Sequence, residues 1–222
     1  DIFSRTMFGA RNSLLIGAMS IIFGIIIGGA LGLLAGYVGK RVDRVIDTIT
    51  NIFLAFPALL LAIFIVGFFD SGTTSEAKSR SIVPIIIALS ILSIPPITRL
   101  VRANTMVYAQ REFVLAARSQ GAKNARIIVR EILPNVLPAM VTFAITGMAV
   151  LIVAEGALAY LGLSVSAPTP TWGAMIFGGQ AKLETAWWIS IMPSIVLFIT
   201  VLTINLLGDV LSEKFRIREA IG

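Results

Sequence analysis

Five long apolar runs, separated by short charged segments, dominate the hydropathy pattern of this chain. A helix rises about 1.5 Å per residue, so a bilayer core of about 30 Å needs about 20 apolar residues. The runs that reach or approach this length are Asn12–Gly39, Thr48–Phe69, Ser81–Thr98, Ile132–Ala154 and Thr185–Gly208. Because they are continuously apolar, without the alternation of a membrane barrel, they predict an all-α bundle of about five transmembrane helices.

The composition agrees with a single transmembrane domain over residues 1–222. Hydrophobic residues make up 57% of the chain and charged residues 14%, whereas a soluble domain carries about 25% charged residues. The chain has no cysteine and no histidine, which excludes Ser-His-Asp and Cys-His catalysis and HExxH zinc sites. It also lacks the GxxxxGK(S/T) loop that binds nucleotide phosphates. We therefore expect a membrane protein with no catalytic site, cofactor or metal of its own.

The basic residues fall unevenly on the segments between the runs. Alternate segments hold thirteen of them against five on the others, and by the positive-inside rule the thirteen face the cytoplasm. The C-terminus is then cytoplasmic and Asp1 lies outside, which favours a sixth, N-terminal helix before Asp1. The net charge of +6 is explained by these loops beside membrane lipid, without nucleic-acid binding.

Two features inside the runs predict local geometry. Glycines at positions 24, 28, 32 and 36 lie four apart, which leaves one helix face bare for close packing; a surface that slides during transport is the alternative. Pro57 removes a backbone hydrogen bond from the second run and predicts a kink, and it is a candidate path or gate residue. Arg41–Thr50 is an amphipathic stretch that leads into the second run, and there Arg44 is expected to neutralise Asp43 or Asp47.

The segment after the fourth run is assigned to the outer side. Glu155 falls at the outer end of that run, where a solvated or capping role is favoured and a place in the path or gate is the alternative. Gly156–Gly173 is apolar and then rich in Pro, Ser and Thr, so it predicts a short helix that dips back at the surface. Trp172, Trp187 and Trp188 are expected in the aromatic belt of the membrane interface.

A polar, basic segment, Arg111–Pro138, separates the third and fourth runs. Phe113–Gln120 predicts a short helix with Ala116 and Ala117 on its surface, and Gly121 suits its end because glycine accepts a left-handed backbone. From the residues alone, the segment is either a solvated loop beside anionic headgroups or a helix that docks on another protein.

The spacing in this segment resembles the cytoplasmic coupling loop of bacterial ABC-importer permeases. Ala116, Ala117, Gly121 and Leu133-Pro134 fall in register with that loop's E-A-A-x3-G-x9-I-x-L-P signature. Leu115 replaces the first Glu of the signature, and Glu131 replaces its Ile. Other segments resemble the dipeptide, oligopeptide and nickel permease family, and most of all its C-type subunit: SRTMFGARNSLLIG (4–17), LGLLAGYVGKRVD (31–43), LAFPALLLA (54–62), RLVRA (99–103), YLGLSVSAPTPTWGAM (160–175) and NLLGDVL (205–211).

The resemblance implies a type I ABC importer permease in the bacterial cytoplasmic (inner) membrane. Such a chain forms half of a path for di- or oligopeptides, or for a related solute such as nickel. Its partners are a homologous B-type permease, two ATPase subunits that bind ATP and Mg, and an extracytoplasmic solute-binding protein. The coupling loop, about 99–131 with the Leu-Pro that follows, docks on an ATPase through Glu112, Leu115, Ala116, Ala117, Arg118, Gly121, Ala122, Leu133 and Pro134.

Two other classes compete with this interpretation. A gradient-driven secondary transporter or channel usually places acids near the bilayer midplane, yet the first three runs contain no charge. An intramembrane enzyme is disfavoured by the missing His and Cys. Activity that requires a separate nucleotide-binding subunit would distinguish an importer from both classes.

Overall fold

The structure is a computed structural model that describes residues 1–71, 81–165 and 168–221. Within these ranges every regular element is helical, so the all-α prediction is confirmed. The elements are α1 (Ile2–Val38), α2 (Lys40–Ala55), α3 (Ala58–Ser71), α4 (Ile82–Tyr108), α5 (Glu112–Ser119), α6 (Asn124–Ile127), the π-helix η1 (Ile128–Ile132), α7 (Leu133–Tyr160), α8 (Trp172–Gly179), the 3-10 turn η2 (Gln180–Lys182), α9 (Leu183–Ala186) and α10 (Trp188–Ile221). Most of the predicted polar connector, Asp70–Arg80, lies outside the described residues.

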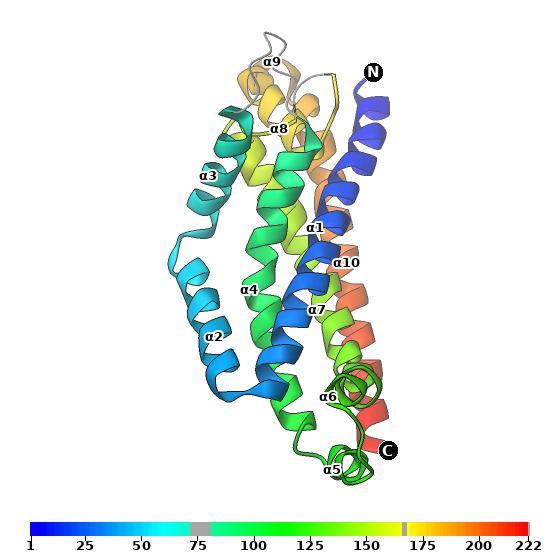
Figure 1. The fold of residues 1–222 in the computed structure, drawn as a ribbon. Helices are drawn as coiled ribbons and strands as arrows, with labels where there is room; N and C mark the ends of the chain where they lie inside the picture. The colour runs from blue at the N-terminus through cyan, green and yellow to red at the C-terminus, as the bar shows by residue number, and fades with distance from the viewer. Residues whose placement is uncertain (72–80, 166–167, 222) are drawn as a thin grey trace.

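Four helical segments are long and apolar enough to cross a membrane: α1, α4, the segment Asn124–Tyr160 that ends with α7, and α10 as far as Phe215. The bent pair α2 and α3 makes a fifth if it is counted as one span. Figure 1 shows α1, α4, α7 and α10 side by side along one long axis, with α2 and α3 following the side of α4. This agrees with the prediction of about five spans.

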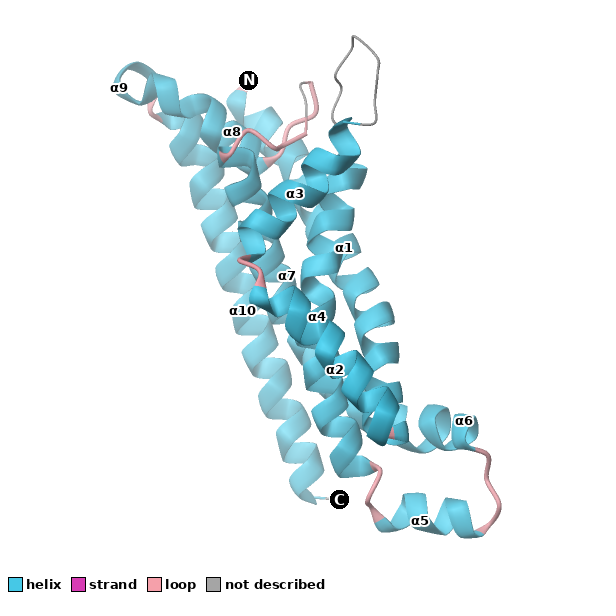
Figure 2. Cartoon of the chain, turned by 60° about the vertical axis from the view of Figure 1, so that its left-hand side comes forward, coloured by secondary structure: helices cyan, strands magenta, loops and turns pink. Residues whose placement is uncertain are grey.

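The two ends of the bundle differ in what they carry. The N-terminus, α8 and α9 lie at one end, here called the α8 end (Figure 1). α5, α6 and the end of α10 lie at the other, here called the α5 end, and Figure 2 shows α5 and α6 projecting sideways there. Asp1–Arg11 and the basic segment 99–131, which the charge pattern assigns to opposite sides, therefore lie at opposite ends.

Close approach of α1 and α4 forms the centre of the bundle. A Cβ atom added at Gly28 would lie 2.8 Å from the carbonyl oxygen of Ile94, and one at Gly32 would lie 2.7 Å from Cβ of Val101. Gly24 and Gly36 meet α4 in the same way, so the four glycines share one face packed on α4. The prediction of close packing is confirmed. Apolar residues of α1, α4 and α7 complete the core around this contact: Ile16, Ile21, Leu89, Ile97, Val101, Val136 and Met140 are buried.

The second predicted run is broken rather than kinked. α2 ends at Ala55, α3 begins at Ala58, and the two helices meet at 92°. The break follows from Pro57, which has no N–H to donate, and from Phe56, whose extended backbone (φ −82°, ψ 137°) is the conformation favoured before proline. All residues from 51 to 60 are exposed, so the surrounding bundle does not cover this bend.

Two helices extend beyond their predicted ends. α1 begins at Ile2 rather than at Asn12, because Thr6, Gly9 and Ser13 are buried against the rest of the bundle. α10 continues through Gly208, which was expected to end the last span. A Cβ atom at Gly208 would lie 2.8 Å from Cγ2 of Thr146 on α7, so this glycine permits close helix packing instead of ending a helix.

Candidate functional site

The short helix α5 is held by well-formed ends. It runs from Glu112 to Ser119, one residue earlier at each end than predicted. Gly121 has φ +79°; its N–H donates to the carbonyl of Arg118 at 3.0 Å, and the N–H of Ala122 donates to the carbonyl of Ala117 at 3.1 Å. This pair of bonds is the Schellman arrangement, and it confirms that Gly121 ends the helix in the left-handed conformation.

One face of α5 is buried and the other is open. Val114 is fully buried, and Ala117 and Ala122 pack partly against the core. On the open side Ala116 is exposed, and Leu115 and Phe113 keep 51% and 39% of their surface in solvent. An apolar exposed face on a helix of eight residues fits contact with another protein better than free solvation.

Tyr37, near the end of α1, ties the loop to the bundle. Its hydroxyl donates to Oδ1 of Asn124 at 2.9 Å, and the guanidinium of Arg118 lies over its ring at 5.5 Å from the centroid. The ring thus bridges α5 and the first residue of α6. This contact could not be predicted from the sequence, because a tyrosine 81 positions before Arg118 gives no local signal.

The other residues expected in the docking surface fall at two places. Glu112 and Arg118 are exposed on α5. Leu133 and Pro134 instead begin α7, where a missing N–H costs little; Leu133 packs partly on the core and Pro134 is exposed. α6 and η1 lie between the two groups, so the residues expected to dock do not form one surface, and most of them lie on or next to α5.

A polar contact that the sequence analysis missed joins α2 to α4. Arg102 donates from Nε to Oδ1 of Asp43, and from its terminal nitrogen to Oδ2 of Asp43 at 2.8 Å. A terminal nitrogen of Arg102 also lies 3.6 Å from Oδ1 of Asp47. The expectation that Arg44 neutralises Asp43 or Asp47 is wrong, because Arg44 lies on the exposed side of α2. The partner of Asp43 stands 59 positions away.

A second contact continues this line along α2. Arg99 donates to Oδ1 of Asn51, and Nδ2 of Asn51 donates to Oδ2 of Asp47 at 2.9 Å. Asp43, Asp47 and Asn51 are four residues apart and therefore share one helix face, opposite two arginines that are three apart on α4. We call these five residues the α2–α4 clasp.

Glu155 lies in a buried polar cluster near the α8 end. Its side chain is fully buried; the hydroxyl of Ser13 donates to its Oε2 at 3.4 Å, and the backbone N–H of Trp172 donates to Ser13 Oγ at 3.1 Å. Oε1 has no hydrogen-bond partner among the described residues. The favoured solvated role for Glu155 is wrong, because α1 and the start of α8 cover the carboxyl group.

The predicted surface helix occurs later in the chain than expected. Helix α7 runs on to Tyr160, where Gly162 (φ +76°) ends it, and the short helix is α8, from Trp172 onward; residues 166 and 167 of the predicted segment lie outside the described residues. Trp172 is buried, and its Nε1–H donates to the carbonyl of Thr6 at 3.0 Å. Placing Trp172 in the aromatic belt is therefore wrong, whereas Trp187 and Trp188 are exposed as expected.

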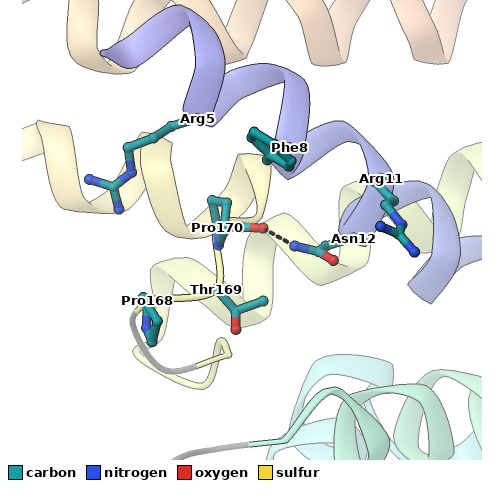
Figure 3. Close-up of a pocket in the computed structure, with 7 residues that line it drawn as sticks. All are labelled: Arg5, Phe8, Arg11, Asn12, Pro168, Thr169 and Pro170. Carbon is teal, nitrogen blue, oxygen red and sulfur yellow. Dashed lines mark hydrogen bonds between the residues drawn. The ribbon is translucent and has the colours of Figure 1, made fainter.

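An open hollow of about 370 Å³ lies beside this cluster (Figure 3). Asn12 fixes one wall by donating to the carbonyl of Pro170 at 2.6 Å. Arg5 and Arg11 flank Phe8 at its rim.

The two candidate path or gate residues are not brought together: Glu155 belongs to the buried cluster, whereas Pro57 lies at the exposed break between α2 and α3. Both roles stay predictions.

Three structural features of the bundle bear on its function. These features are the exposed helix α5 at one end, the contacts that connect α5 to α1 and α4, and the broken helix pair α2 and α3 at the side. No group of three or more metal-ligating side chains occurs within the described residues.

Comparison with known proteins matches this chain to membrane components of transport systems. Residues 28–217 match the family described as binding-protein-dependent transport system inner membrane component. The chain is 40% identical to the glutathione transport system permease protein GsiD of Pectobacterium atrosepticum, covering 96% of this chain and 68% of that protein. It is 38% identical to the dipeptide transport system permease protein DppC of Alkalihalophilus pseudofirmus, covering 96% and 67%.

Solved structures share the fold at low sequence identity. The MetNI methionine ABC transporter in an inward-facing conformation superposes with a TM-score of 0.74 at 22% identity, covering 93% of this chain and 94% of that chain. An amino acid ABC transporter gives a TM-score of 0.69 at 16% identity, covering 96% and 94%. These likenesses concern the fold alone.

Proposed function

The chain belongs to the binding-protein-dependent transport system inner membrane components, and we propose that it is the C-type permease of an ATP-driven importer of peptides or peptide-like solutes. Membership of this family makes it a membrane transport subunit. The solute rests on the relatives, which are named for glutathione and dipeptide transport. Both solutes are short peptides with charged termini, which favours a peptide path over one for nickel.

The open face of α5 carries the proposal of ATP coupling. Leu115 and Ala116 are exposed on a helix whose ends are fixed by backbone bonds and whose other face is buried. A helix that transmits movement from a bound partner must stay folded while it moves. A rigid helix also loses little conformational entropy on binding. We assign this face to the groove of a cytoplasmic ATPase subunit, so that ATP binding by the ATPase moves α5.

Further partners follow from the family description and from the expected mechanism. A binding-protein-dependent system implies an extracytoplasmic protein that delivers the solute. The basic residues of segment 99–131 support an orientation with the α5 end in the cytoplasm and the α8 end outside. A homologous B-type permease supplies the second half of the path. ATP can shift the permease between inward and outward states only if its docking contacts differ between those states.

The test is co-purification of the complex. We would co-express the tagged permease with its partner permease and ATPases, and compare wild type with Ala116→Glu. Ala116 is exposed, so the charge leaves folding unchanged but disrupts an apolar contact; we expect about tenfold less bound ATPase. Ala181→Glu, also exposed but at the α8 end, is the matched control and should retain the ATPase.

Two outcomes would contradict the proposal. If Ala116→Glu retains the ATPase and uptake, α5 is not the docking helix. If wild type binds no ATPase under any nucleotide condition, ATP coupling itself fails, and a gradient-driven transporter becomes the leading alternative.

A further inference from the structure

Arg102 stands where three helices meet. A Cβ atom at Gly32 of α1 would lie 2.9 Å from the backbone nitrogen of Arg102, and one at Gly36 would lie 2.8 Å from its carbonyl oxygen. The backbone of Arg102 is thus pressed on α1, while its side chain reaches Asp43 and Asp47 on α2. One residue therefore connects α1, α4 and α2.

We propose that Asp43 and Arg102 are positioning residues for transport. Their contact makes α2 move together with α4 when α5 moves. The break at Pro57 then lets α2 change its angle relative to α3. This inference rests on the proposed docking of α5 on an ATPase. The clasp would then carry the coupling movement into the broken helix pair.

Short, direct connections link α5 to Arg102. α4 ends at Tyr108, and the N–H of Arg111, the residue before α5, donates to the carbonyl of Tyr108 at 3.1 Å. Tyr37 adds a second connection from α5 to the end of α1. Since α1 and α4 pack through glycines with no room between their backbones, they form one body, and α5 moves with it.

Apart from the clasp, few contacts hold α2 against the α1–α4 pair. Thr50 is the one residue of α2 that is buried, so little apolar packing fixes this helix. Its start has two consecutive residues with positive φ, Gly39 (64°) and Lys40 (49°), and its end meets α3 at 92°. Both ends are thus bends, and the clasp is the contact that fixes the orientation of α2 on α4.

The geometry of the clasp suits a lasting connection. A carboxylate that binds two nitrogens of one guanidinium fixes both distance and angle, and Lys could not replace Arg in this role. The side chains of Arg102 and Asp43 keep only 28% and 20% of their surface exposed. The contact from Arg99 to Asn51 repeats the link three residues earlier on α4.

A charge exchange tests the proposal in the assembled importer. Asp43→Asn and Arg102→Gln should each lower uptake by about tenfold, while ATPase stimulation by the loaded binding protein stays within about twofold of wild type, because docking is intact. The double variant Asp43→Arg with Arg102→Asp restores the pair and should restore most of the uptake. Glu213→Gln, an exposed acid in the last part of α10, is the matched control and should transport normally.

Each result has a definite meaning. Equal loss of membrane level, ATPase activity and uptake in the single variants would show a merely structural role and overturn the proposal. Normal uptake in the single variants, or failure of the exchange to rescue, would overturn it as well.

A distance measurement keeps the clasp testable even if no ATPase binds. The chain has no cysteine, so spin labels at Thr48→Cys and Ala103→Cys, both exposed, report the separation of α2 and α4 in the purified permease. We expect a narrow distribution that Asp43→Asn broadens. An unchanged distribution in Asp43→Asn would refute the clasp, whereas absence of the ATPase alone would refute only the proposed function.

Discussion

Two single residues define the local structure at the two ends of the permease. At the α5 end, Gly121 provides the left-handed turn that stops α5. Near the α8 end, Glu155 accepts a hydrogen bond from Ser13, which also holds the first backbone N–H of α8. Each residue is surrounded differently: the space beside Gly121 is empty, whereas Glu155 is fully covered. Substitutions at the two sites should therefore lower the stability of the fold for different reasons.

Substitution of Gly121 should loosen the end of α5 without disturbing packing. Since a Cβ atom there would meet nothing within 4 Å, Gly121→Ala costs only the left-handed backbone, about 1 kcal/mol. We expect the amides of Gly121 and Ala122 to exchange about fivefold faster. Gly121→Asn should show a smaller effect, because Asn tolerates this conformation. Gly178→Ala, equally open but without positive φ, is the control, and a similar increase there would contradict the explanation.

At Glu155 the expected cost is a lost hydrogen bond in a buried site. Glu155→Gln keeps a carbonyl oxygen for Ser13, whereas Glu155→Met removes the acceptor and should cost about 1–3 kcal/mol. The thermal unfolding midpoint in detergent should therefore fall clearly for Met and little for Gln. If both variants unfold together with wild type, the bond from Ser13 does not hold α8 in place.

Some of these residue roles were readable from the sequence and others were not. The left-handed role of Gly121 follows from the residue type and its place after a short helix. The burial of Glu155 and Trp172 depends on α1, whose contacts lie 142 and 166 positions away. An acid and a tryptophan near a span end are ordinary interface residues until another helix covers them.

The element that gives the bundle its rigidity is the α1–α4 pair. Its four glycines repeat at the spacing of one helix face, and each lies against a backbone or a branched side chain of α4. Such contacts relax poorly, because neither partner can rotate away. This argues against a sliding surface between α1 and α4, and it agrees with the proposal that the bends at the ends of α2 accommodate the movement.

A methyl group on this face should separate the two helices. In Gly32→Ala, the new Cβ would lie 2.7–2.9 Å from Val101, Thr98 and the backbone of Arg102, so we expect a loss of about 1–3 kcal/mol and a lower unfolding midpoint. Gly156→Ala on α7, where nothing lies within 4 Å, should be neutral or slightly stabilising, because Ala favours the helix. Equal midpoints for the two variants would show that the α1–α4 contact is not tight.

Helices were more predictable than their boundaries. Charge-free runs locate α1, α4, α7 and α10, because lipid requires such runs. They do not reveal that Pro57 breaks its run instead of kinking it, since no neighbouring helix covers residues 51–60 and the extended backbone of Phe56 leaves no local signal beyond the proline itself. The clasp itself joins side chains 48 and 59 positions apart, and no local pattern connects them.

On the scale of the whole molecule, the two ends match the two sides of a membrane. The basic segment 99–131 and the end of α10 lie at the α5 end, and the N-terminus and α8 lie at the α8 end. The proposed import function requires two different ends, because ATP is cytoplasmic and the delivered solute is outside. The fold alone does not state which end faces which side; the distribution of lysines and arginines predicts that the α5 end faces the cytoplasm.

Cysteine labelling can decide this orientation directly. Because the chain has no cysteine, Ser119→Cys on α5 and Ala181→Cys at the α8 end, both exposed, each introduce one thiol. We expect a membrane-impermeant maleimide to label Ala181→Cys in spheroplasts and to leave Ser119→Cys unlabelled until the membrane is opened, since the basic loops stay inside. The reverse pattern would place α5 outside, where no ATPase could reach it, and would refute ATP coupling through α5 whatever the solute is.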